Sequence, residues 1–203
     1  MTKVAGVVSA VALLTGCVNH ANEGARSLVD ILGSVQALET NPVDDLNELA
    51  DRSDIVLTGR ITSVEVSTPV YATPDPETPE ATYGGQVLIA TVEPGDGSDE
   101  VMVEFIYQFS GDHALNSPDD VELPDQELVF ALIPTPDSGS TTYRCVADST
   151  WCPLEWNGEG LESASWDEGT LPVDSDDPHS PGFASIDEVT AEMVDGTEAV
   201  AVG

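Results

Sequence analysis

The chain has 203 residues and a formal net charge of −33, because 38 acidic residues face only five basic ones. So acidic a chain is not expected to bind nucleic acid, which needs basic side chains to displace counterions from phosphates, or to dock electrostatically on anionic lipid. Its hydrophobic content of 40% is near that of globular proteins, so the acidic chain is expected to fold as one domain with loose ends.

The first sixteen residues have the form of a secretory signal. A short charged start at residues 1–3 precedes an apolar run at 4–14 and the small pair Thr15-Gly16. The apolar run is too short to span a bilayer, which takes about 20 residues. We expect a signal peptide at 1–16, a polar tether at 17–26, and a single acidic β-rich domain at 27–203 with helices at both of its ends.

A lone cysteine follows this signal. Leu14-Thr15-Gly16-Cys17 resembles the bacterial lipobox, in which the signal is cut before a cysteine that carries diacylglycerol. The resemblance implies that Cys17 is lipidated, that the partner at this end is the membrane, and that the protein faces the exterior. Two or more acyl chains anchor a protein stably, whereas one does so marginally. The alternative is that Cys17 is an incidental apolar residue of the signal.

Two short helices are expected next. Apolar residues recur at helical spacing from Leu28 to Leu38, with Ser27 placed to cap the helix. Asn41-Pro42 interrupts the chain, and residues 43–52 read as a second helix with acids in its first turn.

From residue 55 the hydrophobic period changes to two, which predicts strands. The expected strands cover residues 55–67, with a bend at Gly59, and then 86–93, 100–109, 127–133, 141–146 and 151–156. Residues 73–85 read as a proline-rich loop, 93–100 as a tight connection and 174–182 as an open loop. Ser185 and Glu188 have capping-box spacing before a short terminal helix at 185–193. The fold class is therefore mainly β, a small antiparallel barrel or sandwich.

Three segments carry a second resemblance. The stretches "LNELADRSDIVLTGRITSVE", "LPDQELVFALIP" and "SIDEVTAEM" resemble a class of exported actinobacterial proteins, over about residues 46–195. The layout is similar to the OB-like barrel of netrin and metalloprotease-inhibitor modules. Such inhibitors chelate zinc through a free N-terminal cysteine, which lipidation at Cys17 would remove, so the resemblance implies a fold and no chemistry.

Two cysteines remain once Cys17 is set aside. In an oxidising exterior, Cys145 and Cys152 are expected to form a disulfide. A metal site or a reactive thiol is the alternative, but a zinc site would usually need further Cys or His at short spacing.

Candidate catalytic groups are scarce in the sequence. The histidines, His20, His113 and His179, all fall in polar segments, and Ser180 has no nucleophile-elbow sequence around it. We therefore expect no enzyme activity and no cofactor, with a hydrolase of unrecognised site as a weaker alternative.

Closely spaced acids offer oxygen ligands of the kind that calcium takes. They occur at residues 96–100 and at Asp174, Asp176 and Asp177, although neither loop has the EF-hand order. The sequence thus predicts a lipid-anchored, non-catalytic envelope lipoprotein that acts as a binding or scaffolding module, with an envelope protein as candidate partner. The main alternative is a calcium-dependent binding module.

Overall fold

The computed structural model describes residues 25–33, 43–72, 83–111, 113–135, 142–146, 152–157, 160–164 and 185–200, without the side chains of residues 192 and 195–200. The signal, the tether before residue 25 and the expected helix beyond residue 33 lie outside these ranges.

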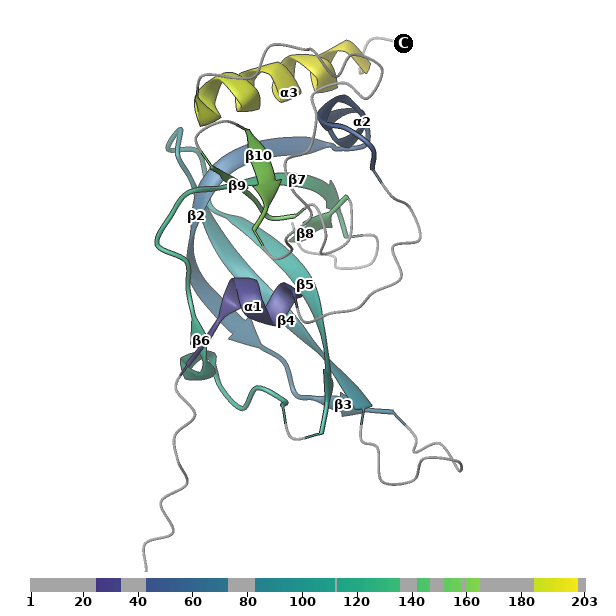
Figure 1. Ribbon diagram of the computed structural model, residues 1–203, viewed down its shortest axis with the longest axis vertical. Coiled ribbons are helices and arrows are strands. Elements are labelled where there is room, and N and C mark those ends of the chain that lie inside the picture. The colour runs from purple at the N-terminus through teal and green to yellow at the C-terminus, as the bar shows by residue number, and fades with distance from the viewer. Residues whose placement is uncertain are drawn as a thin grey trace, which may run out of the picture.

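Five strands close into a small barrel (Figure 1). Around the barrel their order is β2 (Ile55–Val66), β4 (Tyr83–Pro94), β5 (Val101–Ser110), β8 (Thr142–Cys145) and β7 (Leu128–Pro134), which pairs again with β2. Neighbouring strands are antiparallel except β5 and β8, which are parallel. The predicted OB-like barrel is confirmed, with this one parallel pair as the departure from a wholly antiparallel sheet.

The barrel interior follows from alternation along its strands. In β4, Leu88, Ala90 and Val92 are buried, and in β5 the residues at 103, 105, 107 and 109 are buried while their neighbours face outward. Strand β7 is instead buried on both faces. Phe130 and Leu132 belong to the barrel core, whereas Val129 and Ala131 belong to a second apolar cluster outside it.

That second cluster joins the helices to the barrel. Helices α2 (Leu46–Asp51) and α3 (Ile186–Val200) lie together across one end of the molecule, next to the hairpin of β9 (Leu154–Trp156) and β10 (Leu161–Ser163) (Figure 1). Leu49, Leu154, Leu161 and Val189 are fully buried there. This end is therefore a covered, two-layered part of the fold.

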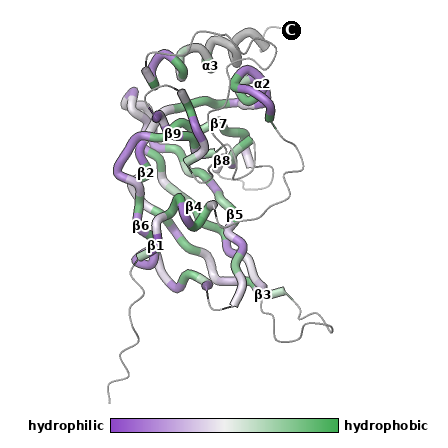
Figure 2. Tube along the Cα trace, in the orientation of Figure 1, coloured by the Kyte–Doolittle hydropathy of each residue, from purple (hydrophilic) through white to green (hydrophobic). Residues whose placement is uncertain are grey.

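The other end is closed by the N-terminal segment. Strand β1 (Arg26–Ser27) pairs in parallel with β6 (Val121–Glu122), which follows the 3₁₀ turn η1 (Pro118–Asp120), and α1 (Leu28–Gly33) places Leu28, Ile31 and Leu32 in the barrel core. Figure 2 shows β1 and β6 side by side at the lower end, away from α2 and α3.

Several predicted boundaries are corrected by the structure. Helix α2 begins at Leu46 rather than residue 43, because the Asp45 side chain accepts a hydrogen bond from the Glu48 backbone N–H and caps the helix there. Residues 83–85, predicted as loop, are strand, since the β4–β5 hairpin continues to the pair Tyr83 and Ser110. Strands β1, β3 (Val70–Tyr71), β6 and β10 were not predicted, because two or three residues show no period.

Candidate binding site

Only some of the site residues predicted from the sequence lie within the described ranges. Cys17 lies outside them, as do the candidate calcium ligands Asp174, Asp176 and Asp177, and so do His20 and His179. Their predicted roles therefore stay predictions.

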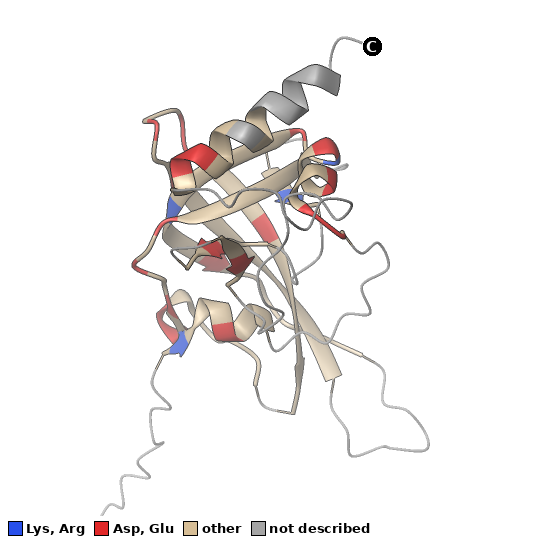
Figure 3. Ribbon diagram, turned by 45° about the horizontal axis from the view of Figure 1, so that its top comes forward, with Lys and Arg blue, Asp and Glu red and all other residues tan. Residues whose placement is uncertain are grey.

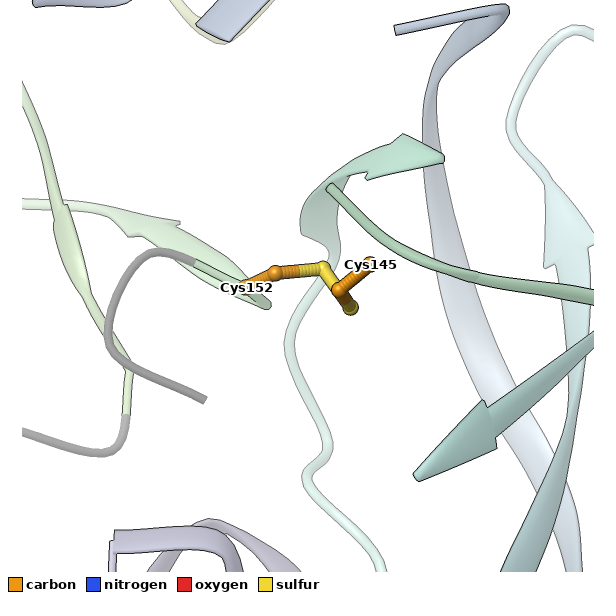
Figure 4. Close-up of a disulfide and its surroundings, with 2 residues drawn as sticks. All are labelled: Cys145 and Cys152. Atoms are coloured by element: carbon orange, nitrogen blue, oxygen red, sulfur yellow. A yellow bond between two sulfur atoms is a disulfide. The ribbon is translucent and has the colours of Figure 1, made fainter. Parts of the chain in front are cut away.

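Cys145 and Cys152 form a disulfide, with an S–S distance of 2.07 Å (Figure 4). The bond connects the end of β8 to the segment that leads into β9, and Cys152 is fully buried in the barrel core. The β9–β10 hairpin is thus held to the barrel covalently, and neither cysteine is a free thiol.

The acidic turn at residues 96–100 lies within the described ranges, and its first carboxylate, that of Asp96, stabilises the turn itself. The Ser98 backbone N–H donates a hydrogen bond to Asp96 Oδ1 at 2.9 Å. This bond, with a smaller contribution from the Ser98 side chain, lowers the pKa of the Asp96 carboxyl below its ordinary value. Within the described ranges, no three His, Cys, Asp or Glu side chains come together in a group that would hold a metal ion.

His113 takes part in the closed lower end through its backbone. Its carbonyl oxygen accepts hydrogen bonds from the Tyr107 hydroxyl at 2.8 Å and from Arg26 Nη1 at 3.3 Å, while the residue itself is exposed. Arg26 Nη1 also donates to the Tyr107 hydroxyl at 2.8 Å. These bonds hold the N-terminal segment against β5.

An open groove of about 560 Å³, which was not predicted from the sequence, lies on the outer surface of the β4–β5 hairpin. Its walls come from β3 and the segment before it, the first residues of β4 and the outward face of β5. Within the described ranges, the lining residues are Ser67, Val70, Tyr71, Ala72, Tyr83, Gly84, Gly85, Gln86, Val87, Ile106 and Gln108. None of them carries a charge, although nearly a fifth of the chain is acidic.

Large apolar side chains are exposed around this groove. Val70 is 74% exposed, Ile106 61%, Tyr83 57% and Tyr71 52%. Figure 3 shows acidic residues on all three helices, on loops and on the short strands β9 and β10, while the lower ends of the long strands have none. A contiguous, uncharged and exposed apolar surface is the usual sign of a binding face.

Two glycines form the floor of the groove. A side chain at Gly84 would collide with Phe109, since its Cβ would lie 2.4 Å from Phe109 Cζ. A Cβ at Gly85 would have only the Tyr107 carbonyl oxygen near it, at 3.7 Å. Gly84 is therefore needed for packing, whereas Gly85 leaves open space above the strand.

A buried glutamine fixes the position of this floor. Gln86 is 2% exposed, and its Nε2 donates to the carbonyl oxygens of Ser67 and Leu115 at 2.9 and 2.8 Å. Its Oε1 accepts from the Leu115 backbone N–H at 2.8 Å. The segment before β3 and the chain at residue 115 are thus both tied to β4.

One sequence signal pointed toward the groove. In the strand at 100–109, Ile106 stands at an outward position between Glu104 and Gln108, where a solvated face would carry a polar residue. The contributions of Val70, Tyr71 and Tyr83 arise only from the pairing of β3 with β4.

Comparison with known proteins found no matching family model, no matching curated protein and no matching solved structure. Among the helices of the described ranges, none has the length and apolar character that crossing a membrane requires.

Proposed function

We propose that this protein is a lipid-anchored lipoprotein of the bacterial cell envelope, facing the exterior, whose barrel is a non-catalytic binding or scaffolding module. The observation that carries the binding role is the uncharged groove of β3, β4 and β5, with four large apolar side chains exposed. The lipobox-like sequence that ends at Cys17 supports the anchor.

The position of the groove on the barrel supports a binding role. Strands β4 and β5 are the second and third of the barrel, and β3 lies in the connection between its first and second strands. In OB-folds, the face of the second and third strands and the loop after the first strand bind ligands. Oligonucleotides are unsuitable ligands here, because the chain after residue 16 has four arginines against 38 acids.

The disulfide and the charge fit an exterior location. Disulfides persist in oxidising compartments outside the cytoplasm, and Cys145–Cys152 joins two elements of this fold. A strongly acidic surface is well hydrated and keeps copies of the protein apart. The protein is thus expected to remain monomeric although its apolar groove is exposed.

Metabolic labelling tests the anchor. The full chain is produced in a bacterium with a lipoprotein pathway and fed an alkyne-tagged fatty acid. Wild type should be labelled and should begin at Cys17, and Cys17→Ser should carry no label. The double variant Cys145→Ser/Cys152→Ser is the control and should keep the label. Unlabelled wild type, or equal labelling of Cys17→Ser, would refute the lipid anchor.

A neutral apolar dye, Nile red, tests the groove. Gly85→Ile places a strand-favouring side chain in the open space of the floor, so dye binding should weaken about tenfold, the equivalent of about 1.4 kcal/mol. Thr91→Ile is the matched control, because it adds a similar apolar side chain at an outward position of β4 outside the groove. Equal dye binding by wild type and Gly85→Ile would rule out the groove as the binding face.

A further inference from the structure

We infer that the groove faces the membrane that holds the anchor, and that its tyrosines and aliphatic side chains enter the interfacial layer of the bilayer. The occupant of the groove is thus a lipid surface. This inference rests on the proposed anchor at Cys17 and adds a second, oriented contact with the same membrane.

The N-terminal segment leaves the fold at the end that carries the groove. Three successive contacts link them: Arg26 lies 5.5 Å from the Tyr107 ring centre, Tyr107 lies 5.7 Å from Phe109, and Phe109 lies 5.6 Å from Tyr71. Figure 2 shows β1 and β3 on opposite sides of the lower part of the molecule, with α2 and α3 at the upper end.

The length of the chain between Cys17 and Arg26 limits how far this end can be from the bilayer. Eight residues lie between the two positions, which makes nine steps along the chain, and a fully extended chain covers at most about 3.3–3.6 Å per step. The N-terminal end of the barrel is therefore held within about 30 Å of the lipidated cysteine. Since β3 is linked to Arg26 by contacts between side chains, the groove is held near the membrane as well.

The chemistry of the groove suits a membrane interface. Tyrosine is enriched at the boundary between headgroups and acyl chains, where its ring is apolar and its hydroxyl stays hydrated. Tyr71 and Tyr83 are exposed near each other where β3 pairs with the start of β4, and Val70 and Ile106 add exposed aliphatic surface to the groove. An interfacial contact gains free energy in proportion to the apolar area that it buries.

The charge of the chain favours a lipid surface over a cationic peptide or a second copy of the protein as the occupant of the groove. A cationic peptide would be expected to meet carboxylates in the groove, but none of the described residues that line it is acidic. After residue 16 the chain has four arginines and 38 acids, a net charge of −34, so a second copy would bring two such charges together. Acids elsewhere on the chain would repel anionic lipid in the same way once the two surfaces come within the Debye length, about 8 Å at physiological salt. A zwitterionic bilayer is thus the best match to an uncharged groove.

The test uses the full lipidated protein in phosphatidylcholine vesicles, with or without bromine atoms on the acyl chains to quench nearby tryptophan. Tyr83→Trp places a reporter at the groove, and Met102→Trp places the matched reporter on the outward face of β5 outside it. We expect brominated lipid to quench the variant Tyr83→Trp at least twofold more strongly than Met102→Trp, after subtraction of the wild-type signal.

A second variant keeps the test decisive. Val70→Asp, added to Tyr83→Trp, should reduce the quenching while flotation of the protein with the vesicles is unchanged, because the lipid anchor is intact. Flotation without preferential quenching of Tyr83→Trp would overturn the inference and leave the anchor standing. Failure of wild type to float would overturn both. A reporter shielded only after envelope proteins are added would assign the groove to a protein partner, and would also overturn the inference.

Discussion

Replacement of Gly84 by alanine should destabilise the barrel, whereas the same replacement at the adjacent Gly85 should not. A Cβ at Gly84 would lie 2.4 and 2.8 Å from two ring atoms of Phe109 and 3.0 Å from the Val70 carbonyl oxygen. Phe109 is only 6% exposed and its ring packs edge-on against Tyr71, so it has little room to move. Overpacking of this kind costs about 1–3 kcal/mol.

At Gly85 the expected sign is the opposite. The nearest atom to a new Cβ is 3.7 Å away, and the residue does not have a positive φ. Alanine therefore fits the native backbone and restricts the unfolded chain, which stabilises a protein by about 0.4–1 kcal/mol. The two variants differ by one methyl group at neighbouring positions, so composition and charge are matched.

Urea unfolding followed by circular dichroism measures this difference. The midpoint for Gly84→Ala should fall with an unchanged slope, and the midpoint for Gly85→Ala should stay or rise. Phe109→Leu removes part of the obstructing ring, so the cost of Gly84→Ala should shrink in that background. Equal midpoints for the two alanine variants, or an undiminished cost in the Phe109→Leu background, would show that the ring does not exclude a side chain at position 84.

Three further outcomes are expected. Gln86→Leu removes three buried hydrogen bonds and should lower the free energy of unfolding in urea by about 3 kcal/mol, at about 1 kcal/mol for each bond. A decrease of less than half that amount would contradict the assigned hydrogen bonds. Replacing both Cys145 and Cys152 by serine should lower the free energy of unfolding by about 2.5 kcal/mol in the same assay. Reduction of the wild-type disulfide should lower it by the same amount. Sodium chloride should raise the melting temperature as much as calcium chloride at matched ionic strength, because both screen acidic repulsion; a rise specific to calcium would favour a metal-dependent module.

The barrel was predictable because its long strands carry period two. Residues 86–93 and 100–109 alternate between core and surface and correspond to β4 and β5. Residues 55–67 correspond to β2 and alternate less strictly, because Val56 and Leu57 are both buried and Thr62 and Ser63 are both exposed. The register shift in β2 lies between Ile61 and Ser63 and not at Gly59, where a bend was expected; at Gly59 the structure shows instead that a Cβ would lie 2.6 Å from the Glu93 carbonyl oxygen of the neighbouring strand. The hydrophobic alternation was therefore enough to predict a strand wherever one face of that strand packs on the core.

The groove was not predictable in the same way. Its β3 wall has two residues, too few to show any period, and its floor was assigned to a loop because Gly84-Gly85 follows a proline-rich stretch. Only the register of Val70 with Gly85 and of Tyr71 with Gly84 brings these segments together. A site made by pairing between distant segments has no signature within either segment.

Acidity and an exposed apolar groove are compatible for a physical reason. An apolar face on a soluble surface normally promotes self-association, but a net charge near −34 opposes the approach of a second copy. A neutral surface or ligand does not experience that repulsion. None of the described residues that line the groove is charged, so the proposed contact would desolvate no carboxylate among them, which would be costly without a partner. Under the proposed function, the acidic residues would repel other acidic surfaces, while the groove of β3, β4 and β5 would stay accessible to uncharged apolar ligands.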